Sequence, residues 1–331
     1  MHGKRLRVGL APGLAQLDPG TGHGKMWSSV LPELHKLGGV KLVDRGRADV
    51  WLASAHEPPP DGRPLVVQAH EAAWREPELR AILHPDFATA LDTVTGATLA
   101  QAAAVIAPSD ASRAQISAAY SFPLERVHSV HHGVDHRLFR PGLAGGRELA
   151  GGPYVLFVGV LHPRKNIDAV RRAVGDLASR GLPHILVIVG GPAPLPDAPE
   201  FEQAARAELP GHPNRVLALR GVPAGELAAL MGGADAFCLP SVFEGFGLPA
   251  LEAMACGAPV IVSDRGALPE VVDGAGLICS TDPAEVSAAV ARVITEPELA
   301  SQMRRAAIER AAGFSWARTA AGWLSVLRDS A

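Results

Sequence analysis

This sequence is poor in aromatic residues, cysteine and lysine, and it contains no long uninterrupted hydrophobic run. Aromatic residues are 5% of its 331 residues, and 31 Lys plus Arg nearly balance 34 Asp plus Glu, for a net charge of −3. Without a basic excess, the chain is poorly suited to a phosphate backbone, so nucleic acid is not an expected partner. Hydrophobic residues nevertheless reach 47%, which is enough for two domains with buried cores and excludes an intrinsically disordered chain.

The few cysteines and the absence of targeting signals predict a cytoplasmic protein. Cys238, Cys256 and Cys279 are odd in number, lie in apolar surroundings and fit no zinc-ligand spacing. No stretch has the length of a signal-peptide core, and none approaches the roughly 20 apolar residues of a membrane span. Contact with a membrane surface stays open, because it needs only a surface patch.

Short β-type runs alternate with helical patterns along the whole chain. The apolar runs are continuous, as in parallel strands that are covered on both faces, so the sequence predicts an α/β protein with two doubly wound sheets. The expected strands are residues 6–10, 41–43, 50–53, 64–68, 103–107, 126–130, 154–158, 184–189, 216–219, 236–239 and 260–262. The expected helices are residues 26–36, 85–102, 111–120, 166–179, 202–208, 224–231, 249–255, 283–295 and 298–312.

A glycine-rich segment without hydrophobic periodicity divides the two halves. Residues 140–153 contain five glycines, and we interpret residues 143–153 as an interdomain linker. The predicted domains are therefore residues 1–142 and 154–315. Because ligands of open α/β sheets bind at the carboxyl ends of the strands, we expect the site in a cleft between the two sheets.

The most informative motif follows the expected strand 236–239. A glycine-rich turn, Glu244-Gly-Phe-Gly247, leads into a helix with Pro249 in its first turn and Glu252 further inside. Free amides at a helix start bind anions or sugar oxygens, and ionised carboxylates accept hydrogen bonds from hydroxyl-rich ligands. This combination predicts a binding site for an anion or for the oxygens of a hydroxyl-rich ligand such as a sugar.

The same block, Glu244-Gly-Phe-Gly-Leu-Pro-Ala-Leu-Glu252 followed by Ala-Met-Ala-Cys-Gly-Ala-Pro-Val-Ile, closely resembles the retaining glycosyltransferases of family 4, or group 1 glycosyltransferases. The resemblance implies the GT-B fold of two facing Rossmann-like domains, with a C-terminal helix (316–330) that returns to the first domain. It also assigns a group of residues to the donor: Gly245, Phe246, Gly247, Leu248 and Glu252, together with Gly159, Gly190 and Val222 at other strand ends.

A basic pair follows the expected strand 154–158. Arg164 and Lys165 stand before a helix start, and Lys165 is one of only five lysines in the chain. A guanidinium, an ammonium and free amides together suit a diphosphate. The resemblance implies that this pair holds the donor diphosphate and stabilises the leaving nucleoside diphosphate.

The first half matches the family more loosely. His70, at the end of the expected strand 64–68, corresponds to the family histidine that contacts the donor sugar. Gly22 and Gly24 resemble the family's first glycine-rich loop, which implies that they approach the donor and the acceptor. Residues 18–25 nevertheless fail the phosphate-loop pattern. Ser109 is expected to cap a helix, and His132 stands where the family usually has Asn, in a segment that we interpret as structural. His131, His132 and His136 fit no zinc pattern and no Asp-x-Asp motif occurs, so neither a metal nor a cofactor is expected.

The predicted function is therefore metal-independent transfer of a hexose, with retention, from a nucleoside-diphosphate sugar to a hydroxyl of a sugar, polysaccharide intermediate or small molecule. Arg164, Lys165, Glu244 and His70 are the candidate catalytic residues. GDP-mannose is favoured over UDP-sugars as donor, while the acceptor and the oligomeric state stay open. A sugar-nucleotide-binding protein, an epimerase and a phosphorylase are the alternatives.

Overall fold

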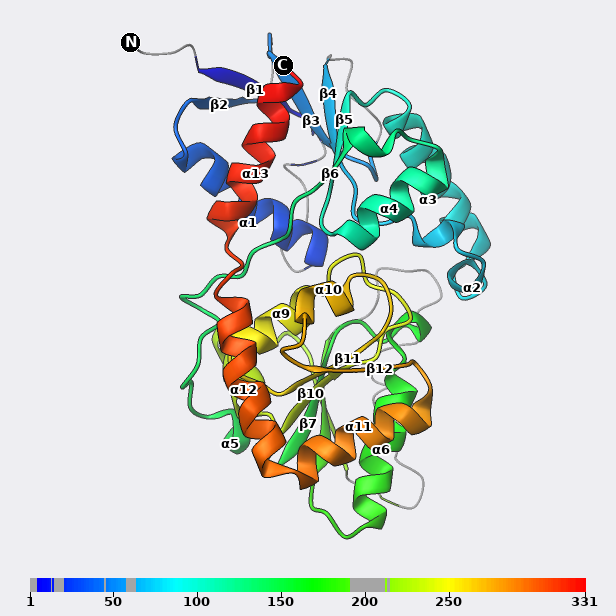
Figure 1. The fold of residues 1–331 in the computed structure, drawn as a ribbon, viewed down its shortest axis with the longest axis vertical. Coiled ribbons are helices and arrows are strands. Elements are labelled where there is room, and N and C mark those ends of the chain that lie inside the picture. Colours follow the sequence, from blue (N-terminus) through cyan, green and yellow to red (C-terminus); the bar gives the residue numbers. More distant parts are fainter. Residues whose placement is uncertain are drawn as a thin grey trace. The chain divides into compact units, whose positions relative to one another are not determined.

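The computed structural model describes residues 5–12, 14, 21–44, 46–57, 64–190, 212 and 215–331, and it divides the chain into two compact units. Unit 1 comprises residues 1–133 and 314–331, and unit 2 comprises residues 134–313 (Figure 1). Each unit contains a six-stranded sheet in which every described strand pairing is parallel. The two-sheet α/β architecture predicted from the sequence is confirmed.

The sheet of unit 1 has the strand order β2-β1-β3-β4-β5-β6. Its strands are β1 (Leu6–Leu10), β2 (Val40–Val43), β3 (Val50–Ser54), β4 (Leu65–Gln68), β5 (Ala104–Ala107) and β6 (Val127–Ser129). Its helices are α1 (Gly22–Lys36), α2 (Pro77–Arg80), α3 (Pro85–Leu99), α4 (Asp110–Tyr120) and α13 (Trp316–Asp329), with short 3₁₀ turns η2 (Ala73–Arg75) and η3 (Leu124–Arg126).

The sheet of unit 2 has the strand order β12-β11-β10-β7-β8-β9. Its strands are β7 (Tyr154–Val158), β8 (Ile185–Val189), β9 (Val216–Leu219), β10 (Ala236–Leu239), β11 (Val260–Ser263) and β12 (Leu277–Cys279). Its helices are α5 (Gly146–Ala150), α6 (Ile167–Ser179), α8 (Ala224–Gly233), α9 (Leu248–Ala255), α10 (Leu268–Val272), α11 (Pro283–Thr295) and α12 (Pro297–Ala311), with the 3₁₀ turn η4 (Pro163–Lys165).

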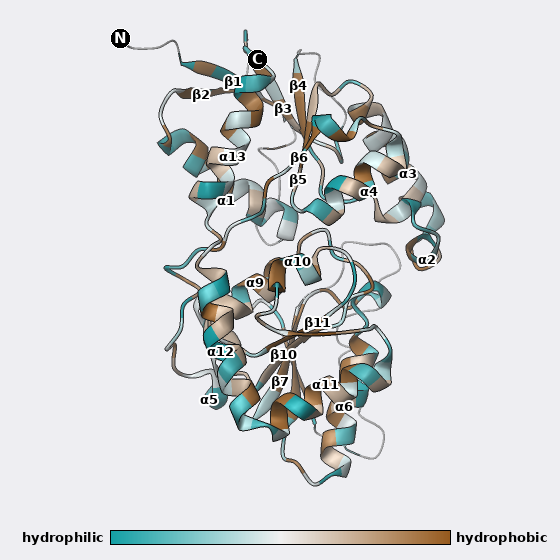
Figure 2. Cartoon of the chain, viewed as in Figure 1, coloured by the Kyte–Doolittle hydropathy of each residue, from teal (hydrophilic) through white to brown (hydrophobic). Residues whose placement is uncertain are grey.

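Hydrophobic burial explains why the short apolar runs form strands. Every residue of β4, β5, β10 and β11 is buried, as expected for parallel strands covered on both faces. Figure 2 shows the strands of both sheets as strongly hydrophobic segments, while many outer helical turns are hydrophilic. In unit 1, Trp27 of α1 meets Trp323 of α13 edge to face, with ring centroids 5.1 Å apart. The C-terminal helix therefore completes the core of unit 1.

The change from unit 1 to unit 2 occurs at Gly133 and Val134, earlier than the predicted boundary at residue 142. A Cβ atom at Gly133 would lie 2.1 Å from the backbone nitrogen of Trp316, so only glycine fits where these two segments meet. Thr319 of α13 also donates a hydrogen bond to the carbonyl of His131, at 2.8 Å. The segment around His132 thus anchors the start of α13, in agreement with the structural role expected for it.

Residues 143–153, predicted as a linker, contribute to unit 2 instead. They contain α5, whose Arg147 forms an ion pair with Asp235. Gly145 and Gly151, at the two ends of α5, have φ angles of +96° and +76°. The glycines that suggested a linker therefore serve as helix-end residues, a use that composition alone does not distinguish from flexibility.

Several other element boundaries differ from the prediction. Helix α1 begins at Gly22 rather than Met26, because the side chain of Thr21 caps it and accepts a hydrogen bond from Gly24 N at 3.0 Å. Strand β12 and the helix α10 were not predicted; both are short. Ser109 caps α4 by accepting from Ser112 N at 3.0 Å, as predicted. The predicted helix 202–208 lies outside the described residues.

Candidate functional site

The carboxyl ends of the six parallel strands lie at one edge of the sheet of unit 2. Gly159 follows β7, Gly190 follows β8 and Val222 follows β9, so these predicted donor residues share that edge. Strand β10 lies between β7 and β11, which places the turn after β10 beside the turn after β7. The topology therefore brings the Glu244 turn next to the basic pair.

Arg164 and Lys165 lie in η4, between the end of β7 and the start of α6. The side chain of His162 caps this turn, because its Nδ1 accepts a hydrogen bond from Arg164 N at 3.1 Å. Asn166 adopts a left-handed conformation, with φ of +52°, at the junction with α6. Its side-chain amide donates to the carbonyl of Thr281 at 2.9 Å, which fixes this junction to a neighbouring loop.

Glu244 joins the two turns. Its Oε1 accepts from Lys165 Nζ at 2.5 Å and from the Ser241 hydroxyl at 2.6 Å. Its Oε2 lies 3.6 Å from Arg164 Nη1, which donates to the carbonyl of Phe243 at 2.9 Å. The sequence predicted that Lys165 faces a diphosphate, whereas the structure places its ammonium against a carboxylate.

This group, hereafter the charged cluster (Arg164, Lys165 and Glu244), is largely withdrawn from water. Glu244 and Lys165 are each 7% exposed. Burial alone would raise the pKa of Glu244, but the charges of Lys165 and Arg164 outweigh it and hold that pKa below its ordinary value. With the carboxylate ionised, the cluster carries one net positive charge.

Two glycines shape the backbone around Glu244. Gly247 has a φ of +98° and precedes α9, and a Cβ there would lie 2.6 Å from Leu268 Cδ2. Gly266 has a φ of +58°, and a Cβ there would lie 2.4 Å from the carbonyl oxygen of Glu244. That carbonyl accepts from Ala267 N at 2.9 Å, so the segment after β11 supports the Glu244 turn. Sequence reasoning singled out Gly247 but missed Gly266 and Ser241.

The other residues of the predicted motif lie on or beside α9. Gly245, Phe246 and Leu248 lead into the helix, and Phe246 is only 4% exposed. Glu252 is 5% exposed and lies inside α9. Burial of the Cys256 thiol, together with the negative charge of Glu252, raises the pKa of that thiol to about 12. The thiol is therefore protonated at neutral pH, and all three cysteines are free.

Unit 1 has a different group of side chains at the carboxyl ends of its strands. His70 follows β4, and its ring contacts the rings of His23 and His132, with centroids 4.7 and 5.4 Å away. His56 follows β3 and stacks on His23, with centroids 5.4 Å apart. We call these four residues, His23, His56, His70 and His132, the imidazole cluster. Among them, sequence reasoning assigned only His70 to the site.

Burial keeps the imidazole cluster neutral. It lowers the pKa of His56 to about 4 and, together with neighbouring histidines, lowers those of His23 and His132 to about 3. Burial and the same neighbours lower the pKa of His70 well below its ordinary value. Within the described ranges, no three His, Cys, Asp or Glu side chains are arranged to hold a metal ion.

Gly22 and Gly24 lie in the first turn of α1, on either side of His23. Neither has the positive φ angle that favours glycine, and a Cβ at Gly22 would meet no atom within 4 Å. The predicted glycine-rich loop is therefore helical at these two positions. Residues 18–20, which were part of that prediction, lie outside the described residues.

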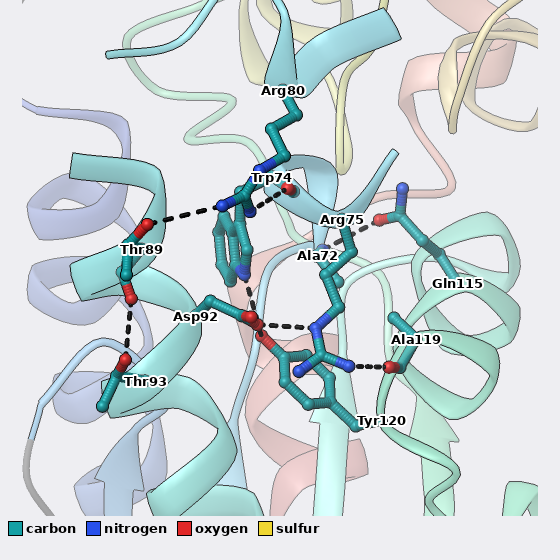
Figure 3. A network of polar contacts seen from close by, with 10 residues as sticks. All are labelled: Ala72, Trp74, Arg75, Arg80, Thr89, Asp92, Thr93, Gln115, Ala119 and Tyr120. Carbon is teal, nitrogen blue, oxygen red and sulfur yellow. Dashed lines mark hydrogen bonds and ion pairs between the residues drawn. The ribbon is translucent and has the colours of Figure 1, made fainter. Parts of the chain in front are cut away.

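A polar network fixes the segment that follows His70 (Figure 3). The Trp74 indole donates to the Tyr120 hydroxyl at 2.8 Å, and that hydroxyl donates to Asp92 at 2.8 Å. Asp92 also accepts from Arg75 Nε at 2.6 Å, and the Arg75 guanidinium lies over the Tyr120 ring. Because the Trp74 ring meets His56 edge to face, this network holds one wall of the imidazole cluster.

The comparisons with known proteins agree with the motif. The family model of the group 1 glycosyl transferases matches residues 146–310, which is most of unit 2. A D-inositol 3-phosphate glycosyltransferase of Acidothermus cellulolyticus is 34% identical over 268 residues, or 77% of this chain and 57% of that protein. An MMP alpha-(1->4)-mannosyltransferase of Mycolicibacterium hassiacum is 34% identical over 66% of this chain and 52% of that protein. The chain thus spans little more than half the length of these curated relatives.

Solved structures show the same fold at low sequence identity. A sucrose-phosphate synthase from Thermosynechococcus elongatus is 19% identical, with a TM-score of 0.73 over 98% of this chain and 99% of that chain. The Anabaena protein HepE in complex with UDP-glucose is 19% identical, with a TM-score of 0.69 over 94% of this chain and 84% of that chain. None of the helices in the described part of the chain is both long enough and apolar enough to cross a membrane. The chain has the GT-B fold, and it belongs to the group 1 glycosyl transferases.

Proposed function

We propose that this chain is a retaining glycosyltransferase that moves a hexosyl group from a nucleoside-diphosphate sugar to a hydroxyl of a sugar or another small acceptor. The observation that carries the proposal is the charged cluster of Arg164, Lys165 and Glu244 at the carboxyl edge of the sheet in unit 2. Its residues come from the two motifs that resemble the family, and family membership supports the assignment.

In this proposal, the charged cluster binds the diphosphate of the donor. Arg164 is 23% exposed at its side chain, whereas those of Lys165 and Glu244 are 9% exposed. Arg164 is therefore the cation best placed to reach an entering phosphate, and Glu244 holds Lys165 in position behind it. The backbone amides from Gly245 to Leu248, which lead into α9, add hydrogen-bond donors for the sugar.

The chemical step breaks the bond between the anomeric carbon and the phosphate oxygen. The electron pair leaves with the nucleoside diphosphate, whose added negative charge Arg164 and Lys165 stabilise. The acceptor oxygen forms the new bond on the same face, and its proton passes to the departing phosphate oxygen. The resemblance assigns Glu252 to ribose hydroxyls and His70 to the donor sugar, and we retain both assignments as parts of the proposal.

For the donor, GDP-mannose and UDP-hexoses are the first candidates. The curated relatives include a mannosyltransferase, and one structural neighbour was solved with UDP-glucose. We propose that no metal is needed, because cationic side chains face the expected diphosphate. Full activity in EDTA would agree with this view, and a requirement for added Mg²⁺ or Mn²⁺ would contradict it.

The test measures donor binding and turnover on the full chain. A thermal-shift screen of GDP-, UDP-, ADP- and dTDP-sugars identifies the donor, and donor hydrolysis or transfer to simple sugars measures catalysis. Proton NMR of the anomeric signal of the product reports retention or inversion. A donor that binds but is neither hydrolysed nor transferred to any sugar would favour the alternative of a sugar-nucleotide-binding protein.

A further inference from the structure

Several polar atoms at the carboxyl edge of the sheet in unit 1 are buried without a hydrogen-bond partner among the described residues. They are His23 Nδ1, His56 Nε2, His70 Nε2 and both side-chain amide atoms of Gln68. Such atoms are rare in native proteins, because a buried polar atom without a partner destabilises the fold unless a ligand or water meets it. Their concentration in one place indicates a binding site.

Gln68 is the clearest member of this group. It is 1% exposed, and its amide carries both a donor group and an acceptor oxygen. Gln68 pairs with Ser54 across β4 and β3, so the two side chains project from the same face of the sheet. The Ser54 hydroxyl lies 3.1 Å from His23 Nε2, which places the Gln68 amide on the face that His23 contacts.

The neighbours of His23 fix its tautomer. The Trp27 indole nitrogen, which can only donate, lies 3.2 Å from His23 Nε2. Nε2 must therefore carry the lone pair, and because His23 is neutral, its proton sits on Nδ1. His23 Nδ1–H is thus a buried hydrogen-bond donor for which the described residues provide no acceptor.

The unmatched atoms include both donors and an acceptor. A hydroxyl group donates and accepts at once, whereas a phosphate or carboxylate anion only accepts and would leave Gln68 Oε1 unmet. The imidazoles here are neutral and offer an anion no opposite charge. The composition of the site therefore matches an uncharged polyhydroxylated molecule.

We propose that His23 and Gln68 bind hydroxyl groups of the acceptor, and that this acceptor presents an uncharged sugar or cyclitol ring to unit 1. The proposal rests on the proposed glycosyl transfer and names the class of its acceptor. His23 Nδ1–H and the Gln68 amide donate to ring hydroxyl oxygens, and Gln68 Oε1 accepts from a ring hydroxyl. These two residues thereby determine specificity.

The first experiment measures binding without any donor. Nitrogen NMR of full-length protein labelled at its His and Gln side chains should show His23 with a protonated Nδ1 and a bare Nε2. Addition of D-mannose, D-glucose or myo-inositol should then shift His23 Nδ1–H and the Gln68 amide. The proposal would be overturned if these two signals shifted only when a phosphorylated sugar was added, or only when a nucleotide sugar was added.

Matched variants separate this role from a purely structural one. His23→Asn can place an amide N–H at the position of Nδ1, whereas His23→Gln reaches the position of Nε2. We expect the Kd for the polyol to stay near its starting value in His23→Asn and to rise at least about tenfold in His23→Gln. Equal affinities for the polyol in both variants would overturn the role of Nδ1–H.

Gln68→Met supplies a second, independent readout. If the amide is kept for a ligand, the apolar substitute of similar shape should leave the unfolding temperature unchanged or higher while it weakens polyol binding about tenfold or more. A lower unfolding temperature with unchanged binding would show that Gln68 is structural. If the unmodified chain hydrolysed no donor, that result would count against the proposed function and not against polyol binding by His23 and Gln68.

Discussion

The two units use the same parallel-sheet framework but place opposite electrostatics at the carboxyl ends of their strands. Unit 2 gathers two cations around one buried carboxylate, whereas unit 1 gathers four neutral imidazoles and an amide. The first arrangement suits a charged phosphate, and the second suits hydroxyl groups. The difference teaches that a shared backbone topology leaves the chemistry to the few residues that follow each strand.

The largest expected effect is the loss of catalysis when Lys165 is replaced. Lys165→Met should reduce glycosyl transfer by about 100-fold or more, since it removes a charge that stabilises the leaving group. It also leaves Glu244 buried without its nearest cation, which should cost about 3–5 kcal/mol of stability. Steady-state kinetics and chemical denaturation measure the two losses separately.

The matched control removes both charges. Lys165→Met with Glu244→Gln should regain most of the stability, because no unpaired buried charge remains, but it should stay inactive. If this double variant transferred sugar at the normal rate, the charged cluster would have no catalytic role. The difference in charge between the two units would then serve the stability of the fold and not catalysis.

The second prediction concerns pH and tests the neutral cluster of unit 1. The folded-state pKa values of His23, His56 and His132 lie below the unfolded value of 6.5. The protein therefore has its full stability above about pH 7, and it loses stability as the pH falls because the unfolded chain then binds more protons. We expect each of these imidazoles to lower the free energy of unfolding by about 2–3 kcal/mol at pH 4.5. The folded-state pKa of Glu244 lies below its ordinary value, so Glu244 stays ionised above pH 4.5. The charged cluster of unit 2 should therefore add little to the change of stability with pH above pH 4.5.

His132→Asn introduces the residue that is usual in the family and removes one of these titrating imidazoles. The dependence of unfolding free energy on pH between about pH 6 and 4.5 should become shallower by about 1.4 kcal/mol per pH unit. Urea denaturation at several pH values provides the measurement. An unchanged slope would mean that His132 does not titrate on unfolding in this range.

The third prediction tests the backbone support of Glu244. Gly266→Ala places a Cβ against the Glu244 carbonyl at a positive φ and should destabilise the protein by about 2–4 kcal/mol, with weaker donor binding. Gly274→Ala is the matched control, because its φ is +79° but a Cβ there meets no atom within 4 Å. That variant should lose only about 1–2 kcal/mol and bind the donor normally. Equal effects of the two substitutions on donor binding would contradict this explanation.

The smallest expected effect concerns the network beside the imidazole cluster. Tyr120→Phe leaves the Trp74 indole without its acceptor and Asp92 without one donor, so we expect a loss of about 1–2 kcal/mol. Thr93→Ala removes an exposed hydrogen bond on α3 within the same region and should change stability by less than about 0.5 kcal/mol. Thermal unfolding of both variants measures the difference, and similar values would show that the network adds little.

Much of the fold and part of the site could be predicted from the sequence. Continuous apolar runs identified the parallel strands, and the block from Glu244 to Glu252 identified the family. The interpretation of residues 143–153 as a linker was wrong, because Gly145 and Gly151 lie at the two ends of the short helix α5. Likewise, Gly22 and Gly24 are helical, since the Thr21 cap extends α1 toward the N-terminus.

The sequence by itself determined the class of fold, the family and the residue types at the strand ends, because these depend on local patterns. Only the tertiary structure decided which of those residues meet. The pairing of Lys165 with Glu244, 79 positions apart, follows from β10 lying beside β7, and the imidazole cluster follows from α1 covering the face of Ser54. Burial then set their charge states, since desolvation neutralises clustered imidazoles but two nearby cations keep a single carboxylate ionised.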